Sequence, residues 1–250
     1  MSDPFGAEEA PPALDTAQDA LFLDFDGCLV EIAPRPDAII VPERLSAVLC
    51  ALAERLDGAL AIVSGRSLPE LETYLSGFDG PMVGSHGAES RGLEEPPLRP
   101  EGLAALQAEL AGFAADKGLL YEPKSLGAGL HYRARPELQA ETEAFATRAA
   151  RRFPGFEVQL AKMAVELRPR GASKDGALAR LTRRAPFAGR RPVYAGDDVT
   201  DEPALAWAEA HGGYGVKVGA GATAARFRLA DPAEIRAWLT TAIGGDAWDG

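Results

Sequence analysis

The sequence predicts an α/β fold: a Rossmann-like core with a parallel sheet, into which a smaller α+β cap domain is inserted. Two apolar runs predict the core, because residues 20–23 and 59–63 each end in polar residues and each precede a helical pattern. A change of rhythm between residues 103 and 168 predicts the insertion. The length of 250 residues, with 46% hydrophobic and 25% charged residues, is enough for a sizeable core.

The core begins with a buried strand at residues 20–23, which stops at the polar sequence DFDG, residues 24–27. A helix is predicted from about Pro42, with proline in its first turn. Its apolar side chains fall on one stripe: Leu45, Val48, Leu49, Leu52 and Leu56.

A second strand at residues 59–63 ends at SGR, residues 64–66. Ser67 and Glu70 then form a capping-box signal for the next helix. Two successive strand–helix units imply a parallel sheet with right-handed crossovers.

The core resumes after the insertion with a helix that opens at Ser173-Lys174. A strand at 193–195 leads to Gly-Asp-Asp at 196–198, and a short strand is predicted at 215–218. Asp231 and the proline after it start a last amphipathic helix.

The inserted segment has an αββαββ pattern with short loops, which permit only hairpin connections and therefore an antiparallel sheet. The predicted order is helix 103–117, strands 119–124 and 128–133, helix 136–152, and strands 156–160 and 163–168.

Prolines between residues 92 and 100, and the sequence Pro-Arg-Gly at 169–171, mark the domain boundaries and candidate hinges. We expect the core at residues 18–92 and 170–250 and the cap at 93–169. The acidic, proline- and alanine-rich start predicts disorder for residues 1–17.

Composition excludes several partners. The net charge of −11 repels nucleic acid and anionic membranes, and no apolar run approaches about 18 residues. Cys28 and Cys50 lack metal-ligand spacing and predict free thiols, as in a reducing cytoplasm. We expect a cytoplasmic monomer that binds a small phosphorylated molecule, no nucleic acid and no membrane.

Polar residues stand where three predicted strands end. In an open parallel sheet these ends share one crevice, so Asp24, Asp26 and Ser64 should meet the acidic cluster near residue 200. A lone Asp-x-Asp is as often only a turn or a helix cap as it is a functional motif. Several carboxylates together repel unless a hard cation neutralises them, which predicts a Mg²⁺ site. The acidic cluster consists of Asp197, Asp198 and Asp201.

Lys174 alone would be a surface residue, but beside acidic groups it can hold a phosphoryl oxygen. Ser64 is either the polar end of a strand or a phosphoryl contact, and Gly65 would let backbone N–H groups approach an anion. Arg66 is either solvated or paired with the acidic cluster.

These motifs resemble a known set. DFDG at 24–27, SGR at 64–66, Lys174 in SKDGAL and GDDVTDE at 196–202 resemble, in order, the four motifs of the haloacid-dehalogenase-like phosphatases. GDDVTDE, with GSHGAE at 84–89 and the αββαββ cap, is similar to the trehalose-6-phosphate phosphatases in particular. The resemblance covers nearly the whole chain after about residue 18.

The resemblance implies a Mg²⁺-dependent phosphatase in which Asp24 is the nucleophile that becomes an aspartyl phosphate. Asp26 would protonate the leaving sugar oxygen and later activate water. Asp24 and Asp197 would bind Mg²⁺ through side chains and Asp26 through its carbonyl, with Asp198 and Asp201 holding waters or orienting that shell. The phosphoryl group would be contacted by Ser64 and Lys174, with Gly65 and Arg66 beside it.

Specificity is expected on the cap. Strand alternation places Glu122 and Lys124 on the same face of one strand. On the next strand it places His131 and Arg133 on one face, and Leu130 and Tyr132 on the other. Such a face is equally often only solvated, but the resemblance implies that it binds sugar hydroxyls. Glu166, His86 and Glu89 complete the substrate-binding candidates, with His86 equally a structural histidine.

The expected substrate is trehalose 6-phosphate, within trehalose biosynthesis. The alternatives are another sugar phosphate, such as sucrose or mannosyl phosphate, and a non-catalytic sensor that accepts phosphate on Asp24. Asp26 counts against the sensor, because an acid two residues from the nucleophile serves turnover and not storage.

Overall fold

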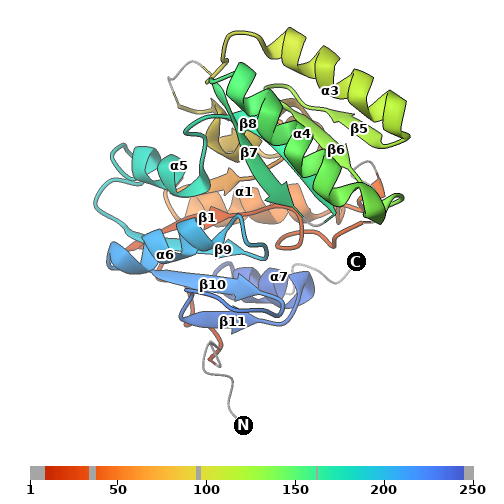
Figure 1. Cartoon of the computed structure of the whole chain (residues 1–250). Coiled ribbons are helices and arrows are strands. Elements are labelled where there is room, and N and C mark those ends of the chain that lie inside the picture. The colour runs from red at the N-terminus through yellow and green to blue at the C-terminus, as the bar shows by residue number, and fades with distance from the viewer. Residues whose placement is uncertain (1–8, 34–37, 94–96, 162, 245–250) are drawn as a thin grey trace. The chain divides into compact units, whose positions relative to one another are not determined.

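The structure, a computed structural model, describes residues 9–33, 38–93, 97–161 and 163–244 (Figure 1). The chain forms two compact units, one of residues 1–94 and 173–250 and the other of residues 95–172. The second unit starts two residues later and ends three residues later than the 93–169 expected from sequence, because the chain passes through a turn at Gly171 before the core resumes.

The larger unit is built on a sheet whose order, within the described residues, is β11-β10-β9-β1-β2-β3-β4. All neighbouring pairs are parallel except β3 and β4. The predicted α/β class with a parallel sheet is therefore confirmed. The strands are β1 (Asp19–Leu23), β2 (Leu60–Val63), β3 (Met82–Gly84), β4 (Glu89–Arg91), β9 (Arg191–Gly196), β10 (Tyr214–Val218) and β11 (Phe227–Leu229).

Strands β1 and β2 are buried along their whole length, as expected for central parallel strands. The chain steps from β1 to β2 and β3 in one direction, and from β9 to β10 and β11 in the other. The direction therefore reverses between β1 and β9. Ligands bind at such a reversal, beyond the carboxyl ends of the strands, in open α/β sheets.

The helices of this unit lie on both faces of the sheet. Right-handed crossovers that step in opposite directions put α1 and α6 on opposite faces, and α1 contacts α7 whereas α5 contacts α6. Their bounds are α1 (Leu45–Arg55), α2 (Leu68–Tyr74), α5 (Lys174–Leu181), α6 (Glu202–Ala210) and α7 (Pro232–Thr241).

The predicted helix starts are visible as hydrogen bonds. Ser67 N donates to the Glu70 carboxylate at 3.0 Å as part of the expected capping box at the start of α2. The side chain of Ser173 accepts from Gly176 N at 3.2 Å, and Asp231 accepts from Glu234 N at 2.9 Å.

The smaller unit has an antiparallel sheet of order β5-β6-β8-β7. Helix α3 contacts β5 and β6, and α4 contacts β7 and β8, so both helices cover the face that carries Leu130, Val165 and Leu167. The elements are α3 (Leu103–Lys117), β5 (Leu120–Pro123), β6 (Ala128–His131), α4 (Gln139–Arg152), β7 (Phe156–Ala161) and β8 (Ala164–Pro169), with a 3₁₀ turn at Pro136–Leu138.

The start of the chain differs from the disorder predicted for residues 1–17. Residues 1–8 lie outside the described part, but from Glu9 onward the chain is held by backbone groups: Glu9 O accepts from Arg228 N, and Pro12 O accepts from the indole of Trp238 at 2.8 Å. Leu14 is also buried. A polar, proline-rich composition concealed these contacts because their partners lie more than 200 residues away.

No helix within the described ranges combines the length and the apolarity that crossing a membrane requires.

Candidate active site

Three carboxylates meet at the sheet reversal. Asp24 follows β1, Asp197 follows β9, and Asp201 precedes α6. One carboxylate oxygen from each lies within 4.8 Å of the others. The backbone adds to this convergence, since Asp24 N donates to Ala195 O at 2.9 Å. The predicted meeting of sequence-distant residues therefore occurs.

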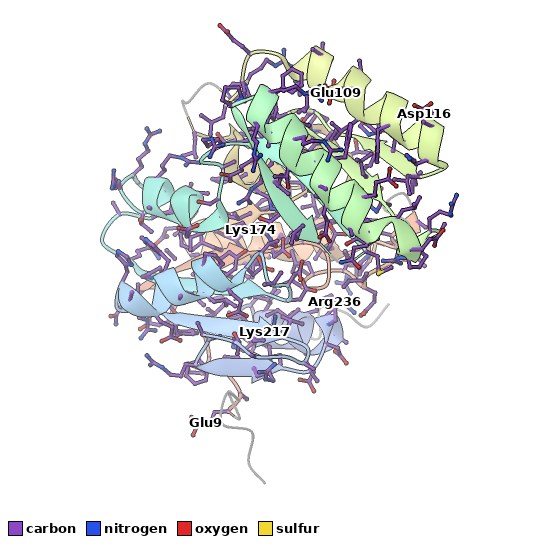
Figure 2. The ribbon with its side chains drawn as sticks, viewed as in Figure 1. Glu9, Glu109, Asp116, Lys174, Lys217 and Arg236 are labelled. Atoms are coloured by element: carbon purple, nitrogen blue, oxygen red, sulfur yellow. The ribbon has the colours of Figure 1, made fainter. Side chains whose placement is uncertain are left out.

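Lys174 is the first residue of α5 (Figure 2), and its side chain joins this cluster. Its Nζ lies 2.8 Å from Asp24 Oδ1 and 2.6 Å from Asp201 Oδ1. All three side chains are nearly inaccessible to solvent. Asp201 is further fixed by hydrogen bonds from the Tyr194 hydroxyl and from the Asp198 N–H at 3.0 Å.

The cluster holds more negative than positive charge. Burial and the charge of Asp201 raise the pKa of Asp24 well above its ordinary value, although Lys174 opposes the shift. Burial likewise raises the pKa of Asp197 to about 7. Burial would also raise the pKa of Asp201, but the charge and hydrogen bond of Lys174 lower it overall. A hard divalent cation would relieve this excess.

The donor set fits such a cation. Asp24, Asp197 and Asp201 offer oxygen ligands only, which is the chemistry that Mg²⁺ prefers. The other two residues predicted as ligands differ. Asp198 is exposed and accepts from its neighbour Val199 N, and Asp26 directs its carboxylate to Arg66, so neither carboxylate belongs to this group of three.

Arg66 forms a two-point pair with Asp26, with Nε and Nη2 each 2.7 Å from a carboxylate oxygen. The guanidinium also lies 3.4 Å from Glu70 and 5.0 Å from the ring centre of Tyr74. Arg66 is therefore buried rather than solvated, but it pairs with Asp26 and Glu70 and not with the acidic cluster near residue 200 that the sequence suggested. The arginine is 8% exposed, whereas the Asp26 side chain is 34% exposed, so the pair is shielded on the arginine side and open to solvent on the aspartate side.

Ser64, which follows β2, is buried and its Oγ accepts from Arg66 N at 3.2 Å. Gly27 has a φ of 74° and approaches Asp197 so closely that a Cβ there would lie 2.1 Å from its carboxylate. Only glycine fits both the left-handed backbone and this contact.

Lys217 and Tyr194 were not predicted as site residues. Lys217 lies in β10 (Figure 2) and is 3% exposed. Its Nζ donates to the backbone oxygen of Asp197 and lies 3.6 Å from Glu202. A charged residue inside the apolar run Tyr-Gly-Val-Lys-Val was a signal that could have identified it. Tyr194 carried no such signal, because a tyrosine in a strand usually serves packing.

His86 lies in the turn between β3 and β4, and Glu89 is the first residue of β4. Both are tied to neighbouring backbone: His86 N donates to Ser64 O at 3.0 Å, and Glu89 Oε1 accepts from Leu68 N at 2.9 Å. Glu89 also accepts from the Ser85 hydroxyl at 2.6 Å. These contacts place both residues beside the loop that carries Ser64.

The smaller unit has its own charged cluster on the sheet face opposite its helices. Lys124 Nζ lies 3.3 Å from both Glu122 and Glu166, and His131 Nε2 lies 2.8 Å from Glu122. Gly129 stands opposite both glutamates in the strand register, which leaves room for their side chains.

The predicted alternation holds for the charged cluster, but it does not extend to Arg133. Leu130 packs into the core on the other face, as predicted. Strand β6 ends at His131, so Arg133 lies beyond the strand and is exposed; among the described residues it forms no ion pair with the charged cluster.

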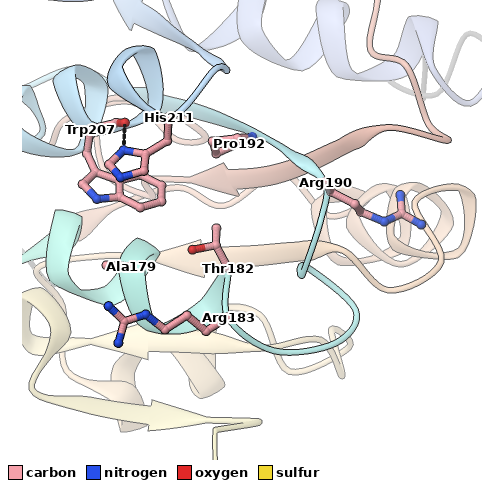
Figure 3. Close-up of a pocket in the computed structure, with 7 residues that line it drawn as sticks. All are labelled: Ala179, Thr182, Arg183, Arg190, Pro192, Trp207 and His211. Carbon is pink, nitrogen blue, oxygen red and sulfur yellow. Dashed lines mark hydrogen bonds between the residues drawn. The ribbon is translucent and has the colours of Figure 1, made fainter.

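A separate pocket of about 360 Å³ lies near the start of β9, the end opposite Asp197 (Figure 3). Trp207 and His211 stack there with ring centres 3.8 Å apart. None of the predicted site residues lines it. The lining residues are Ala179, Thr182, Arg183, Arg190, Pro192, Trp207 and His211.

Comparisons with known proteins agree over most of the chain. A family model described as trehalose-phosphatase matches residues 22–233. The chain is 39% identical over 236 residues to "Trehalose-6-phosphate phosphatase" of Escherichia coli (strain K12), covering 91% of this chain and 89% of that protein. It is 40% identical over 219 residues to "Probable trehalose-phosphate phosphatase" of Sinorhizobium fredii (strain NBRC 101917 / NGR234), covering 85% of this chain and 83% of that protein.

Solved structures share the fold. The crystal structure of a "trehalose-6-phosphate phosphatase related protein" superposes with a TM-score of 0.74 at 30% identity, covering 89% of this chain and 96% of that one. The C-terminal domain of Candida albicans trehalose-6-phosphate phosphatase superposes with a TM-score of 0.76 at 22% identity, covering 93% and 98%.

Proposed function

The chain belongs to the trehalose-phosphatase family, and from this premise we propose that it hydrolyses trehalose 6-phosphate to trehalose and inorganic phosphate. The observation that carries the chemistry is the buried contact of Lys174 with Asp24 and Asp201 at the sheet reversal. A nucleophilic carboxylate, a cation for a phosphoryl oxygen and an oxygen-only metal site are thereby within reach of one phosphate.

In the proposed reaction a carboxylate oxygen of Asp24 attacks phosphorus, and the bond from phosphorus to the sugar oxygen breaks. Asp26 gives its proton to that leaving oxygen, which releases trehalose. A water then attacks the aspartyl phosphate, Asp26 takes a proton from it, and inorganic phosphate leaves with Asp24 restored. The pair between Asp26 and Arg66 has to open for these proton transfers.

Lys174 and Ser64 would bind the phosphoryl oxygens, where charge is spread in the transition state. Asp24, Asp197 and Asp201 would hold Mg²⁺, which when bound offsets the negative charge of the phosphate. Asp198 and the carbonyl of Asp26 stay candidates for completing that shell.

For the sugar, we propose the charged cluster of the smaller unit: Glu122, Lys124, His131 and Glu166. Its groups are both donors and acceptors, which suits hydroxyl recognition, and a ligand lacking a hydroxyl would leave one of them without its partner. The proposal for Arg133 has less support, because it is not part of the cluster.

The free thiols Cys28 and Cys50 support a reducing compartment such as the cytoplasm, and a monomer stays a prediction.

The test is phosphate release from trehalose 6-phosphate, sucrose 6-phosphate and glucose 6-phosphate, with Mg²⁺, with EDTA and with Asp24→Asn. Metal-dependent preference for trehalose 6-phosphate, lost in Asp24→Asn, is the expected result. Preference for another sugar would overturn the substrate and keep the mechanism. A stable phosphoprotein without turnover would instead favour the sensor.

A further inference from the structure

The segment that joins β3 to β4 has an unusual backbone. Ser85 and His86 have φ values of 48° and 55°, and Gly87 follows at 109°. Left-handed backbone is sparsely populated by residues other than glycine, and two such residues in succession persist only where surrounding contacts enforce them. Strain of this kind gathers at functional sites, so the contacts that enforce it are informative.

On one side, the segment is bonded to the loop that carries Ser64. Ser85 N donates to Arg66 O at 2.7 Å, and His86 N donates to Ser64 O at 3.0 Å. These two hydrogen bonds flank Gly65. Gly65 is the residue expected from the sequence to let backbone N–H groups approach the phosphoryl group.

The imidazole of His86 lies directly beside Gly65. A Cβ built on Gly65 would be 2.6 Å from His86 Cε1 and 2.8 Å from Nε2, closer than real Cβ contacts. His86 is 9% exposed, so the ring is packed rather than free to turn into solvent. The ring therefore limits the movement of the Gly65 peptide.

On the other side, the segment touches the start of α5. A Cβ on Gly87 would lie 2.6 Å from Ser173 O, and Arg180 Nη2 donates to Gly87 O at 2.8 Å. Ser173 caps the helix whose first residue is Lys174. Residues 85–87 thus span from the loop of Ser64 to the helix start of Lys174.

We propose that His86 is a positioning residue: its ring holds the Gly65 peptide at a fixed place relative to Lys174, and it does not contact the sugar. This inference rests on the proposed phosphatase function and replaces the sugar-binding role expected for His86 from the sequence. The strained backbone of residues 85 and 86 is what directs the ring against Gly65.

The test compares His86→Asn, Gly65→Ala and the double variant. Asparagine tolerates the left-handed backbone, and its side chain ends before the positions of Cε1 and Nε2, the atoms nearest Gly65. Each enzyme is assayed with trehalose 6-phosphate and with p-nitrophenyl phosphate, which has no sugar. His211→Asn, on the exposed pocket wall, is the matched control.

We expect His86→Asn to lower kcat about tenfold or more on both substrates, because small misplacements of binding groups are costly. The ratio of kcat/KM for the two substrates should stay within about twofold of wild type. Gly65→Ala should be strongly impaired, and adding His86→Asn should restore part of its activity by removing the clash. His211→Asn should match wild type.

Two results would overturn the inference. A loss confined to trehalose 6-phosphate would make His86 a sugar contact, and a double variant no better than Gly65→Ala would show that ring and glycine are not coupled. If His86→Asn proves thermally unstable, the activities of Gly65→Ala and the double variant, each corrected for the folded fraction, still decide whether the ring and the glycine are coupled. Failure of the proposed substrate alone is distinguishable, because the p-nitrophenyl phosphate assays judge the positioning independently.

Discussion

Asp197 carries a prediction about pH and metal binding. Burial raises its pKa to about 7, so in the metal-free protein it takes up a proton as pH falls through that value. A metal ligand must be deprotonated, and the proton therefore competes with Mg²⁺. Mg²⁺ should bind roughly tenfold or more weakly at pH 6 than at pH 8. Isothermal titration calorimetry at both values measures this.

The folded protein should show the same linkage in its stability. Since the folded pKa of Asp197 lies above its unfolded value, the ionised carboxylate destabilises the metal-free protein above pH 7, and the penalty is relieved as pH falls. Asp197→Asn should flatten that dependence. Mg²⁺ affinity that stays level from pH 6 to pH 8 would contradict a ligand role for this carboxylate.

Lys217 carries a second prediction at the residue scale. Lys217→Met removes the donor to the backbone oxygen of Asp197, and a buried acceptor without its donor costs about 1–3 kcal/mol. Urea unfolding should show that loss in the free energy of unfolding. A separate activity assay should show a lower kcat. Arg226→Met, at an exposed arginine that pairs with Glu209, should change stability by no more than about 0.5 kcal/mol. Equal losses in both variants would refute a special role for Lys217.

The sequence predicted those candidate site residues that stand at recognisable positions in the pattern of strands and helices. Asp24, Asp197 and Lys174 stand at strand ends or a helix start, where pattern alone predicts convergence. Lys217 and Tyr194 were missed because their roles come from partners that only the folded sheet brings near, namely the backbone of Asp197 and the carboxylate of Asp201.

At the scale of elements, long regular segments were predictable and short ones were not. Strands β1 and β2 and helix α3 show clear apolar patterns. The three-residue strands β3, β4 and β11 have too few residues for a period, and β4 reads Glu-Ser-Arg, which is polar throughout. Such strands form because a neighbour offers its edge, and no local signal reports that.

The charged sheet face of the smaller unit leads to a prediction on specificity. In Lys124→Met, Glu122 and Glu166 lose their shared cation, and a donor for sugar hydroxyls disappears. The ratio of kcat/KM for trehalose 6-phosphate over p-nitrophenyl phosphate should fall about tenfold or more. Arg168→Met is the control, because that arginine pairs with Glu157 on the same sheet face. An equal fall on both substrates would contradict sugar recognition by Lys124.

At the scale of the whole molecule, each unit has its own apolar core. The core of the smaller unit is contributed by both helices and by β6, β7 and β8: Leu106, Leu110, Ala114, Ala128, Leu130, Ala146, Ala149, Phe156, Val165 and Leu167. All these residues come from one continuous stretch of chain. The N-terminal segment, by contrast, is fixed by partners near the C-terminus, so the larger unit closes only when both of its halves are present.

This difference predicts that residues 95–172, expressed alone, fold independently. An antiparallel sheet covered by two helices needs no contact from elsewhere in the chain, although a core of this size supplies only about 3–5 kcal/mol. Urea unfolding of the fragment, monitored by circular dichroism, should therefore be cooperative with a small free energy of unfolding. Leu130→Ala, at a fully buried position, lowers the free energy of unfolding by about 2–5 kcal/mol and should abolish the transition. Leu120→Ala, at an exposed position, should preserve the transition. A fragment without any cooperative transition would mean that the smaller unit depends on the larger one for its fold.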